Sequence, residues 1–255
     1  MWTIAARELR SLFLSPLAWS ILGAVQVIFG WFFALLLFWF IRPEVQSSLA
    51  NDPNAPGLTA MVIGSLLDWM VIVLLLITPL LTMRLISEER HNKTLPLLLS
   101  APISMTSIIL GKFLGLMGFF LIMLGMLMLM PLSILFGGSL DFGQLASGLL
   151  GIILLLGALT ALGLYISTLT AQPTVAAIST FGAFLLLWML DWGGNTEAPN
   201  NILTYLSDIL TYLSITNHYQ PLLKGLFSTA DVIYYVLFIA LFLILSIQRL
   251  DADRI

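Results

Sequence analysis

Six long apolar runs constrain the fold of this chain more than any other feature of its sequence. A helix needs about 20 apolar residues to cross the ~30 Å hydrocarbon core of a membrane. Each run meets or approaches that length, and together they cover residues 17–41, 58–83, 108–136, 145–169, 174–190 and 230–247. The sequence therefore predicts an all-α, polytopic membrane protein in which six transmembrane helices form a single domain over residues 1–255.

The composition excludes most soluble functions. Of the 255 residues, 60% are hydrophobic and 9% are charged, whereas a soluble domain averages about 45–50% apolar and roughly 25% charged residues. So few charges cannot cover a water-facing surface, which excludes a soluble enzyme, a nucleic-acid binder and a disordered chain. The net charge is −3 and cysteine is absent. We therefore expect no nucleic-acid partner, no disulfide and no bound metal.

The basic residues of the loops predict the orientation of the chain. Lysine and arginine concentrate on the cytoplasmic side of a membrane protein. With the N-terminus inside, only Arg42 and Lys224 fall in outer loops. The other eight are inside, namely Arg7, Arg10, Arg84, Arg90, Lys93, Lys112, Arg249 and Arg254. This bias predicts a multi-pass protein with both termini in the cytoplasm.

Residues 1–16 predict an amphipathic helix on the inner membrane surface. One helical face is apolar, while Arg7 and Arg10 lie on the other, with Glu8 between them in sequence. The apolar face comprises Trp2, Ala5, Ala6, Leu9, Leu12 and Phe13. Two interpretations remain open, a membrane anchor and a contact with a cytosolic partner.

The long outer segment, residues 191–229, predicts a second amphipathic helix at the outer interface, between spans five and six. Its apolar residues recur at helical spacing between polar ones. They are Ile202, Leu203, Leu206, Ile209, Leu210 and Leu213. The four residues from Ser228 to Asp231 then predict a capping box that opens the last span.

The cytoplasmic loop of residues 84–107 carries an unusual density of charge followed by an apolar patch. Arg84–Glu88 and Glu89–Lys93 are spaced as i,i+4 ion pairs, so the second span can continue as a charged helix. A break is expected at residues 94–96, because the residue before a proline avoids the helical region. The leucine-rich run 95–99 follows. An exposed apolar patch on a short loop favours a docking surface, with insertion into the lipid interface as the alternative.

These motifs resemble the type-2 ATP-binding-cassette (ABC) permease family. The resemblance rests on the order Arg-Leu-Ile-Ser-Glu-Glu-Arg at 84–90, Thr94-Leu95, a leucine run, Ser100-x-Pro102 and Leu110-Gly111-Lys112. The starts of the chain (6–17) and of the last span (218–235) are also similar to the family. The subgroup most similar to it comprises the stand-alone permeases of gliding-motility and nitrous-oxide-reductase maturation systems. Lys93 stands where this family usually has glycine, and Pro96 where an acidic residue is common.

The resemblance implies a function and its partners. In this family the 84–107 loop docks on a separate ATPase subunit, which implies docking roles for Arg84, Glu88, Glu89, Arg90, Lys93, Thr94, Leu95 and Leu98. The chain has no G-x-x-x-x-G-K-[ST] motif, so ATP and magnesium would be bound by the partner and no cofactor by this chain. The resemblance also implies a second permease copy or paralogue, an exporter-type complex in a bacterial inner membrane and, as a further possible partner, an accessory outer-face protein.

Two polar residues within the spans are candidates for a transport pathway. Asp68 is either a pathway group or an interfacial aspartate near a helix start, and Gln26 is either a pathway group or an interhelical hydrogen-bond donor. An ion- or proton-coupled carrier with Asp68 as its coupling site is therefore the alternative function. Catalysis is not expected, because His91 and His218 fall on opposite sides of the membrane. Gly111, Gly115 and Gly118 predict a face on which another helix packs closely.

Overall fold

The computed structural model describes residues 1–51, 56–95, 103–136, 139–194 and 212–253, with side chains omitted over 191–194. Every regular element in these ranges is helical. The elements are α1 (Trp2–Leu14), α2 (Pro16–Phe40), α3 (Pro43–Ala50), the π-helix η1 (Thr59–Gly64), α4 (Ser65–Thr82), α5 (Ser87–His91), α7 (Met105–Ser133), the 3₁₀-helix η2 (Ile134–Phe136), α8 (Phe142–Leu169), α9 (Pro173–Gly194), α11 (Ile215–Leu223) and α12 (Thr229–Ala252).

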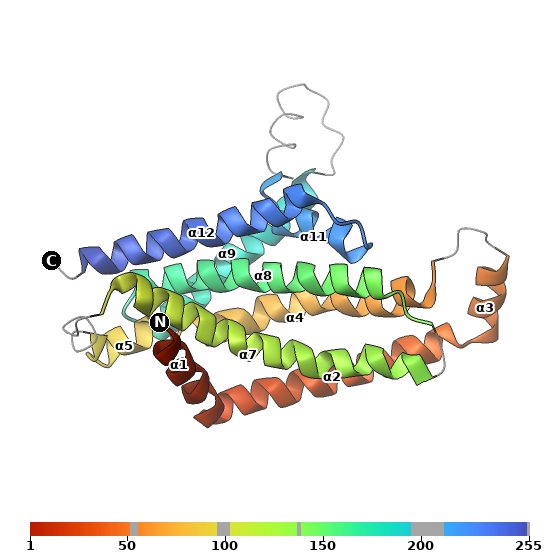
Figure 1. Cartoon of the computed structure of the whole chain (residues 1–255), viewed down its shortest axis with the longest axis horizontal. Coiled ribbons are helices and arrows are strands. Elements are labelled where there is room, and N and C mark those ends of the chain that lie inside the picture. The colour runs from red at the N-terminus through yellow and green to blue at the C-terminus, as the bar shows by residue number, and fades with distance from the viewer. Residues whose placement is uncertain (52–55, 96–102, 137–138, 195–211, 254–255) are drawn as a thin grey trace, which may run out of the picture.

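The described helices confirm the six predicted spans. Six of them are long and apolar enough to cross a membrane, and they run side by side along the length of the molecule (Figure 1). Their bounds are Pro16–Phe40, Thr59–His91, Met105–Phe136, Phe142–Leu169, Pro173–Leu190 and Thr229–Ala252. The protein is thus an all-helical, multi-pass membrane protein.

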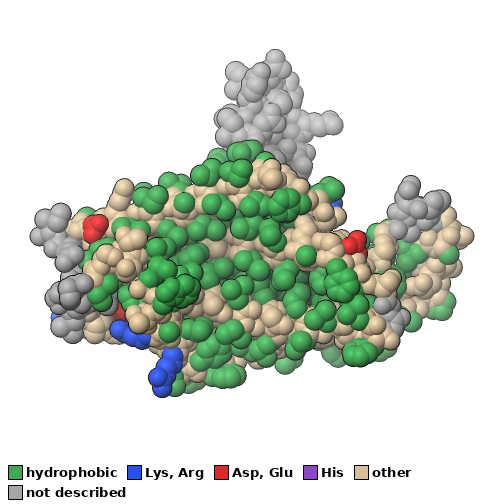
Figure 2. All heavy atoms as spheres, in the orientation of Figure 1, with side chains coloured by type: hydrophobic (Ala, Val, Ile, Leu, Met, Phe, Trp, Pro, Cys, Tyr) green, Lys and Arg blue, Asp and Glu red, His purple; other side chains and the backbone are tan. Residues whose placement is uncertain are grey.

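Helix α8 forms the centre of the bundle. It packs against α4, α7, α9, α11 and α12, and 67% of its most apolar stretch is buried, against 22% for α2. Small residues permit this close packing: a Cβ atom at Gly163 would lie 2.5 Å from Thr82 Oγ1. Hydrophobic side chains cover most of the visible flank of the molecule, while charged ones lie towards its ends (Figure 2). That distribution suits a lipid-facing surface.

Helix α1 crosses the beginning of α7 and packs on it directly. A Cβ at Gly111 would come within 2.8 Å of Ile4, and one at Gly115 within 2.7 Å of the Glu8 Cβ. The predicted close-packing face on α7 is therefore occupied by α1. Part of the apolar face of α1, including Ala5 and Leu12, is buried in protein, while Arg7 and Arg10 are exposed.

The outer segment is described only in part. The apolar residues of the helix expected near the outer interface lie outside the described residues, apart from Leu213. Helix α11 follows them and packs on α8, where a Cβ at Gly151 would lie 3.0 Å from the ring of Tyr219. The predicted capping box is wrong: Ser228 precedes α12 without a side-chain cap, and Asp231 instead bonds His218. A nearby imidazole outcompetes the local backbone for this carboxylate.

Candidate functional site: a charged junction between α1 and α5

A turn over residues 83–86 separates α4 from α5, where the sequence predicted a continuous helix. The backbone N–H groups of Ile86 and Ser87 donate to Ser167 Oγ on α8, at 3.1 and 3.0 Å. The same hydroxyl donates to the Met83 carbonyl at 3.3 Å. A hydroxyl has one donor and two acceptor sites, so Ser167 uses all of them. The central helix thereby fixes the angle at which α5 leaves the bundle.

A residue with left-handed backbone lies two positions after the end of α5. Lys93 has φ +57°, and the N–H groups of Lys93 and Thr94 donate to the Arg90 and Glu89 carbonyls at 3.2 and 2.9 Å. This pair of bonds defines a Schellman motif, whose left-handed position favours glycine. The resemblance to the family placed a glycine here, and the geometry supplies the physical reason.

The charges of α5 point in two directions. Arg84 and Glu88 form the predicted i,i+4 pair at 3.9 Å, and both residues are partly exposed. The predicted Glu89–Lys93 pair is wrong, because Glu89 turns inward to Lys112. Arg90 also points away from the Arg84–Glu88 pair, and it forms an ion pair with Asp253, which follows α12. Only one side of the charged helix is thus presented outward.

Lys112 of α7 lies at the centre of this junction. Its ammonium group is 2.8 Å from Glu89 Oε1 on α5 and 3.3 Å from Glu8 Oε2 on α1. Only 3% of Lys112 is exposed. A buried charge is tolerated only where opposite charges and hydrogen bonds compensate it, and here two helices supply the compensating carboxylates. Lys112 therefore joins α1, α5 and α7.

A polar cleft of about 240 Å³ opens beside this ion-pair network. One wall comes from α1 and the α1–α2 turn, and the other from the end of the second span and α5. The lining residues are Arg7, Glu8, Ser11, Leu12, Ser15, Arg84, Glu88, Glu89, Asn92, Thr94 and Lys112. The two segments that the sequence singled out separately, residues 1–16 and the 84–107 loop, therefore form one composite surface.

Of the predicted apolar patch 95–99, only Leu95 is among the described residues. Leu95 is 5% exposed and belongs to the hydrophobic core, because burying its side chain removes apolar surface from water. Lys93 and Thr94 beside it are exposed. Leu98 lies outside the described residues.

Sequence reasoning missed the junction role of Lys112 and Asp253, although a lone lysine inside an apolar run was a signal.

The two pathway candidates lie apart from the junction. Gln26 Nε2 donates to the Met123 carbonyl at 3.4 Å, which joins α2 to α7 as the packing interpretation predicts. Asp68 lies in α4, which continues η1 without a break, so the residue is not at a free helix start. It is exposed and accepts a hydrogen bond from Gln220 Nε2 on α11 at 3.1 Å.

Hydrogen-bonding and aromatic side chains gather around α11, at the end of the bundle far from the junction. His218 Nδ1 lies 2.7 Å from Asp231 Oδ1 and its Nε2 lies 3.0 Å from the Tyr212 carbonyl. Its ring stacks on Tyr234 with the centroids 4.0 Å apart.

The Tyr219 hydroxyl donates to the Leu67 carbonyl. Burial, and then the charge of Asp68, raise the pKa of Tyr219 well above 10.0, so this hydroxyl stays a donor.

These features define a polytopic helical membrane protein with a composite charged surface at one end. Residues 2–253 match the family described as ABC-2 family transporter protein. The chain belongs to this family. No curated protein matches the sequence significantly. The family consists of membrane permeases that are in general non-catalytic and work with an ABC ATPase.

Proposed function

We propose that this chain is the permease subunit of an ABC complex that moves a substrate across the membrane with ATP hydrolysed by a separate ATPase subunit. ATP and magnesium are bound by that partner. Two permeases, identical or paralogous, form the working unit, in a bacterial inner membrane with both termini in the cytoplasm. Similarity to the gliding-motility and nitrous-oxide-reductase maturation permeases supports the exporter type.

The composite surface of α1 and α5 is the observation that carries this proposal. Arg84 and Glu88 line the cleft and are partly exposed, and Lys93 is exposed. With Thr94 and Leu98 they form the proposed contact with the ATPase. Arg7 and Arg10 extend the same charged end along α1. Glu89 and Arg90 are proposed to act from behind this surface, since they tie α5 to Lys112 and Asp253.

The junction provides a route for force from the ATPase into the spans. A displacement of α5 acts on α1 and α7 through Lys112, on α12 through Arg90, and on α8 through Ser167. We propose that closure of the two ATPases moves α5 and thereby tilts the spans. Such coupling requires that the contact differs between nucleotide states. Asp68 is exposed and bonded to Gln220, which adds no support to a carrier.

The test uses the partly exposed Arg84–Glu88 pair. Glu88→Arg changes the surface charge, while the double variant Arg84→Glu with Glu88→Arg swaps the charges and preserves the pair. We expect both variants to lose co-purification of the ATPase, because the partner contacts the individual charges on this surface, whether or not they pair with each other. Lys224→Glu, a charge reversal at an exposed residue after α11 at the other end of the bundle, is the matched control. Retention of the ATPase by both junction variants would contradict the proposal.

A further inference from the structure

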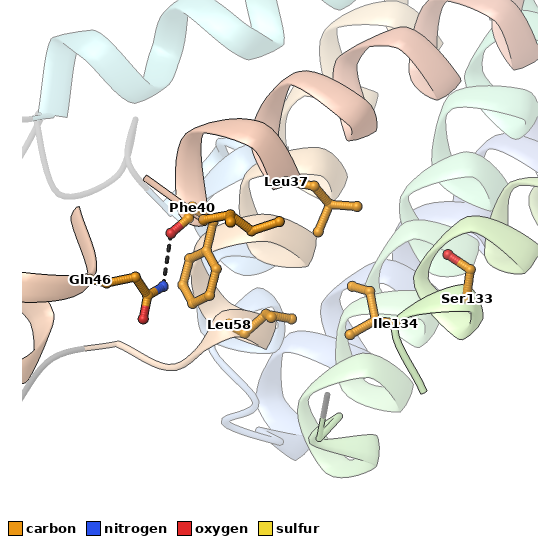
Figure 3. A pocket seen from close by; sticks show the side chains of 7 residues that line it. Leu37, Phe40, Gln46, Leu58, Ser133 and Ile134 are labelled. Carbon is orange, nitrogen blue, oxygen red and sulfur yellow. Dashed lines mark hydrogen bonds between the residues drawn. The ribbon is translucent and has the colours of Figure 1, made fainter. Parts of the chain in front are cut away.

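An apolar cavity of about 420 Å³ lies at the other end of the bundle from the charged junction. It is bounded by the last turns of α2 and α7, by Leu58 before η1, and by α3 (Figure 3). Leu37, Phe40, Leu58 and Ile134 supply most of its wall. Its volume falls within the range of about 300–1,000 Å³ that is typical of small-molecule sites.

Each of the two polar side chains at the wall donates one hydrogen bond within the protein, and Gln46 keeps one further N–H. Gln46 Nε2 donates to the Phe40 carbonyl at 2.8 Å, and this bond, drawn in Figure 3, holds α3 against the end of α2. Ser133 Oγ donates to the Met130 carbonyl at 2.6 Å. The cavity therefore offers few donors to water or to a polar ligand. Protein interiors leave few voids larger than a water molecule, so a hydrocarbon group is the chemically matched occupant.

The position of the cavity specifies where that hydrocarbon comes from. Both α2 and α7 are membrane spans, and the cavity lies at their ends. The neighbouring Phe38 and Phe136 are 75% and 97% exposed, which marks an apolar surface around it. An acyl chain of a lipid in the adjoining leaflet reaches this level of the bundle without crossing water.

Two residues of opposite charge come shortly after the cavity-lining end of α2 in the sequence. Arg42 comes directly after Ile41, and Glu44 lies in the first turn of α3. Both residues are exposed, and in the described part of the chain neither forms an ion pair. A cation and an anion two residues apart complement a headgroup that carries a phosphate and an ammonium group.

We propose that this cavity binds one acyl chain of a zwitterionic glycerophospholipid of the phosphatidylethanolamine type. Arg42 contacts the lipid phosphate and Glu44 contacts its ammonium group. This lipid site goes beyond the proposed ATP-driven function, and it stands whether or not an ATPase docks at the opposite end.

Photolabelling tests the acyl-chain part of the proposal. The full chain is reconstituted in nanodiscs that contain phosphatidylethanolamine with a diazirine in its acyl chain, and the labelled residues are mapped by mass spectrometry. We expect labelling concentrated on the cavity wall, and loss of most of it in Leu58→Trp and in Ile134→Phe, which fill the space. Leu129→Trp is the matched control, since Leu129 is 66% exposed on the lipid-facing side of α7.

The headgroup part has its own readout. Glu44→Gln should lower labelling by phosphatidylethanolamine and leave phosphatidylglycerol labelling unchanged, whereas Arg42→Gln should lower both, each by about fivefold for an exposed ionic contact. Labelling spread evenly along α2 and α7, or unaffected by the filling variants, identifies annular lipid only and overturns the proposal. Equal responses of the two lipids to Glu44→Gln overturn the headgroup assignment. Melting temperatures of all variants show whether each still folds.

Discussion

The two ends of this bundle are held together by different chemistry. At the charged junction, ion pairs connect α5 to α7 and α12, and α7 to α1. At the other end, the His218–Asp231 contact and tyrosine hydroxyls bonded to backbone carbonyls attach α11 to α12 and α4. Ion pairs depend weakly on direction, whereas hydrogen bonds to carbonyls require alignment. The contrast indicates that the charged side chains of α5 can shift against their partners while Ser167 holds the preceding turn, whereas α11 keeps its geometry.

The local backbone supports the same distinction. Helix α5 has only five residues and follows a turn, so its position depends on side chains from other helices. Helix α11 has its buried face against α8, with Tyr219 and Leu222 close to Gly151. The junction is therefore built from contacts that neighbouring helices provide. The following variants break or sharpen this comparison, in order of decreasing expected effect.

Lys112→Met should have the largest effect. It leaves Glu8 and Glu89 facing each other without their shared cation, and breaking a buried ion pair in this way costs about 3–5 kcal/mol. We expect a corresponding fall in the unfolding free energy in detergent, together with loss of ATPase co-purification. Adding Glu8→Gln and Glu89→Gln should restore much of the stability, because no unpaired charge then remains. Lys224→Met, an exposed change at the other end, is the control. Equal stability of the two single lysine variants would show that the network is not a structural junction.

Gly115→Val should come next, since it forces α1 away from α7. The new Cβ would lie 2.7 Å from the Glu8 Cβ and 3.0 Å from the Ala5 carbonyl oxygen, and overpacking of this kind costs about 1–3 kcal/mol. Cysteine cross-linking between α1 and α7 should report the separation. Gly125→Val on the same helix meets no atom within 4 Å and serves as the comparison. If both variants cross-link like the parent chain, α1 does not depend on this contact.

Asp231→Asn tests the opposite end. The amide keeps the shape of the carboxylate but weakens the contact with His218, which should cost about 1–2 kcal/mol. Thermal unfolding followed by tyrosine fluorescence should detect this loss. Binding of the ATPase should stay at the level of the parent chain, because the change is remote from α5. A loss of binding would show that the two ends are coupled more tightly than the contacts indicate.

Lys93→Gly should have the smallest effect, and it should be stabilising. Glycine adopts a positive φ without the steric penalty of a Cβ atom, but it also has greater conformational entropy in the unfolded chain. The net increase in the unfolding free energy is about 0.5 kcal/mol. Asn92→Gly is the matched comparison, because Asn92 has φ −77° and gains nothing from glycine. The difference between the melting temperatures of the two variants measures the strain. A lower melting temperature for Lys93→Gly than for Asn92→Gly would refute a strained left-handed lysine.

Local patterns in the sequence were sufficient to predict the six spans, the helical N-terminus and the Arg84–Glu88 pair. Each depends on residues within a few turns of one another, where helical periodicity and hydropathy carry the information. The close-packing glycines of α7 were also visible in the sequence, although their partner α1 was not.

Only the tertiary structure decided which groups meet across long separations in the chain. Glu89 pairs with Lys112 and not with Lys93, Asp231 bonds His218 and does not cap its own helix, and Leu95 is buried. In each case a partner from another element outcompeted the local one, because a buried charge, carboxylate or apolar group gains most where neighbouring helices exclude water. The helices follow from local hydropathy, and the charged junction follows from how those helices pack.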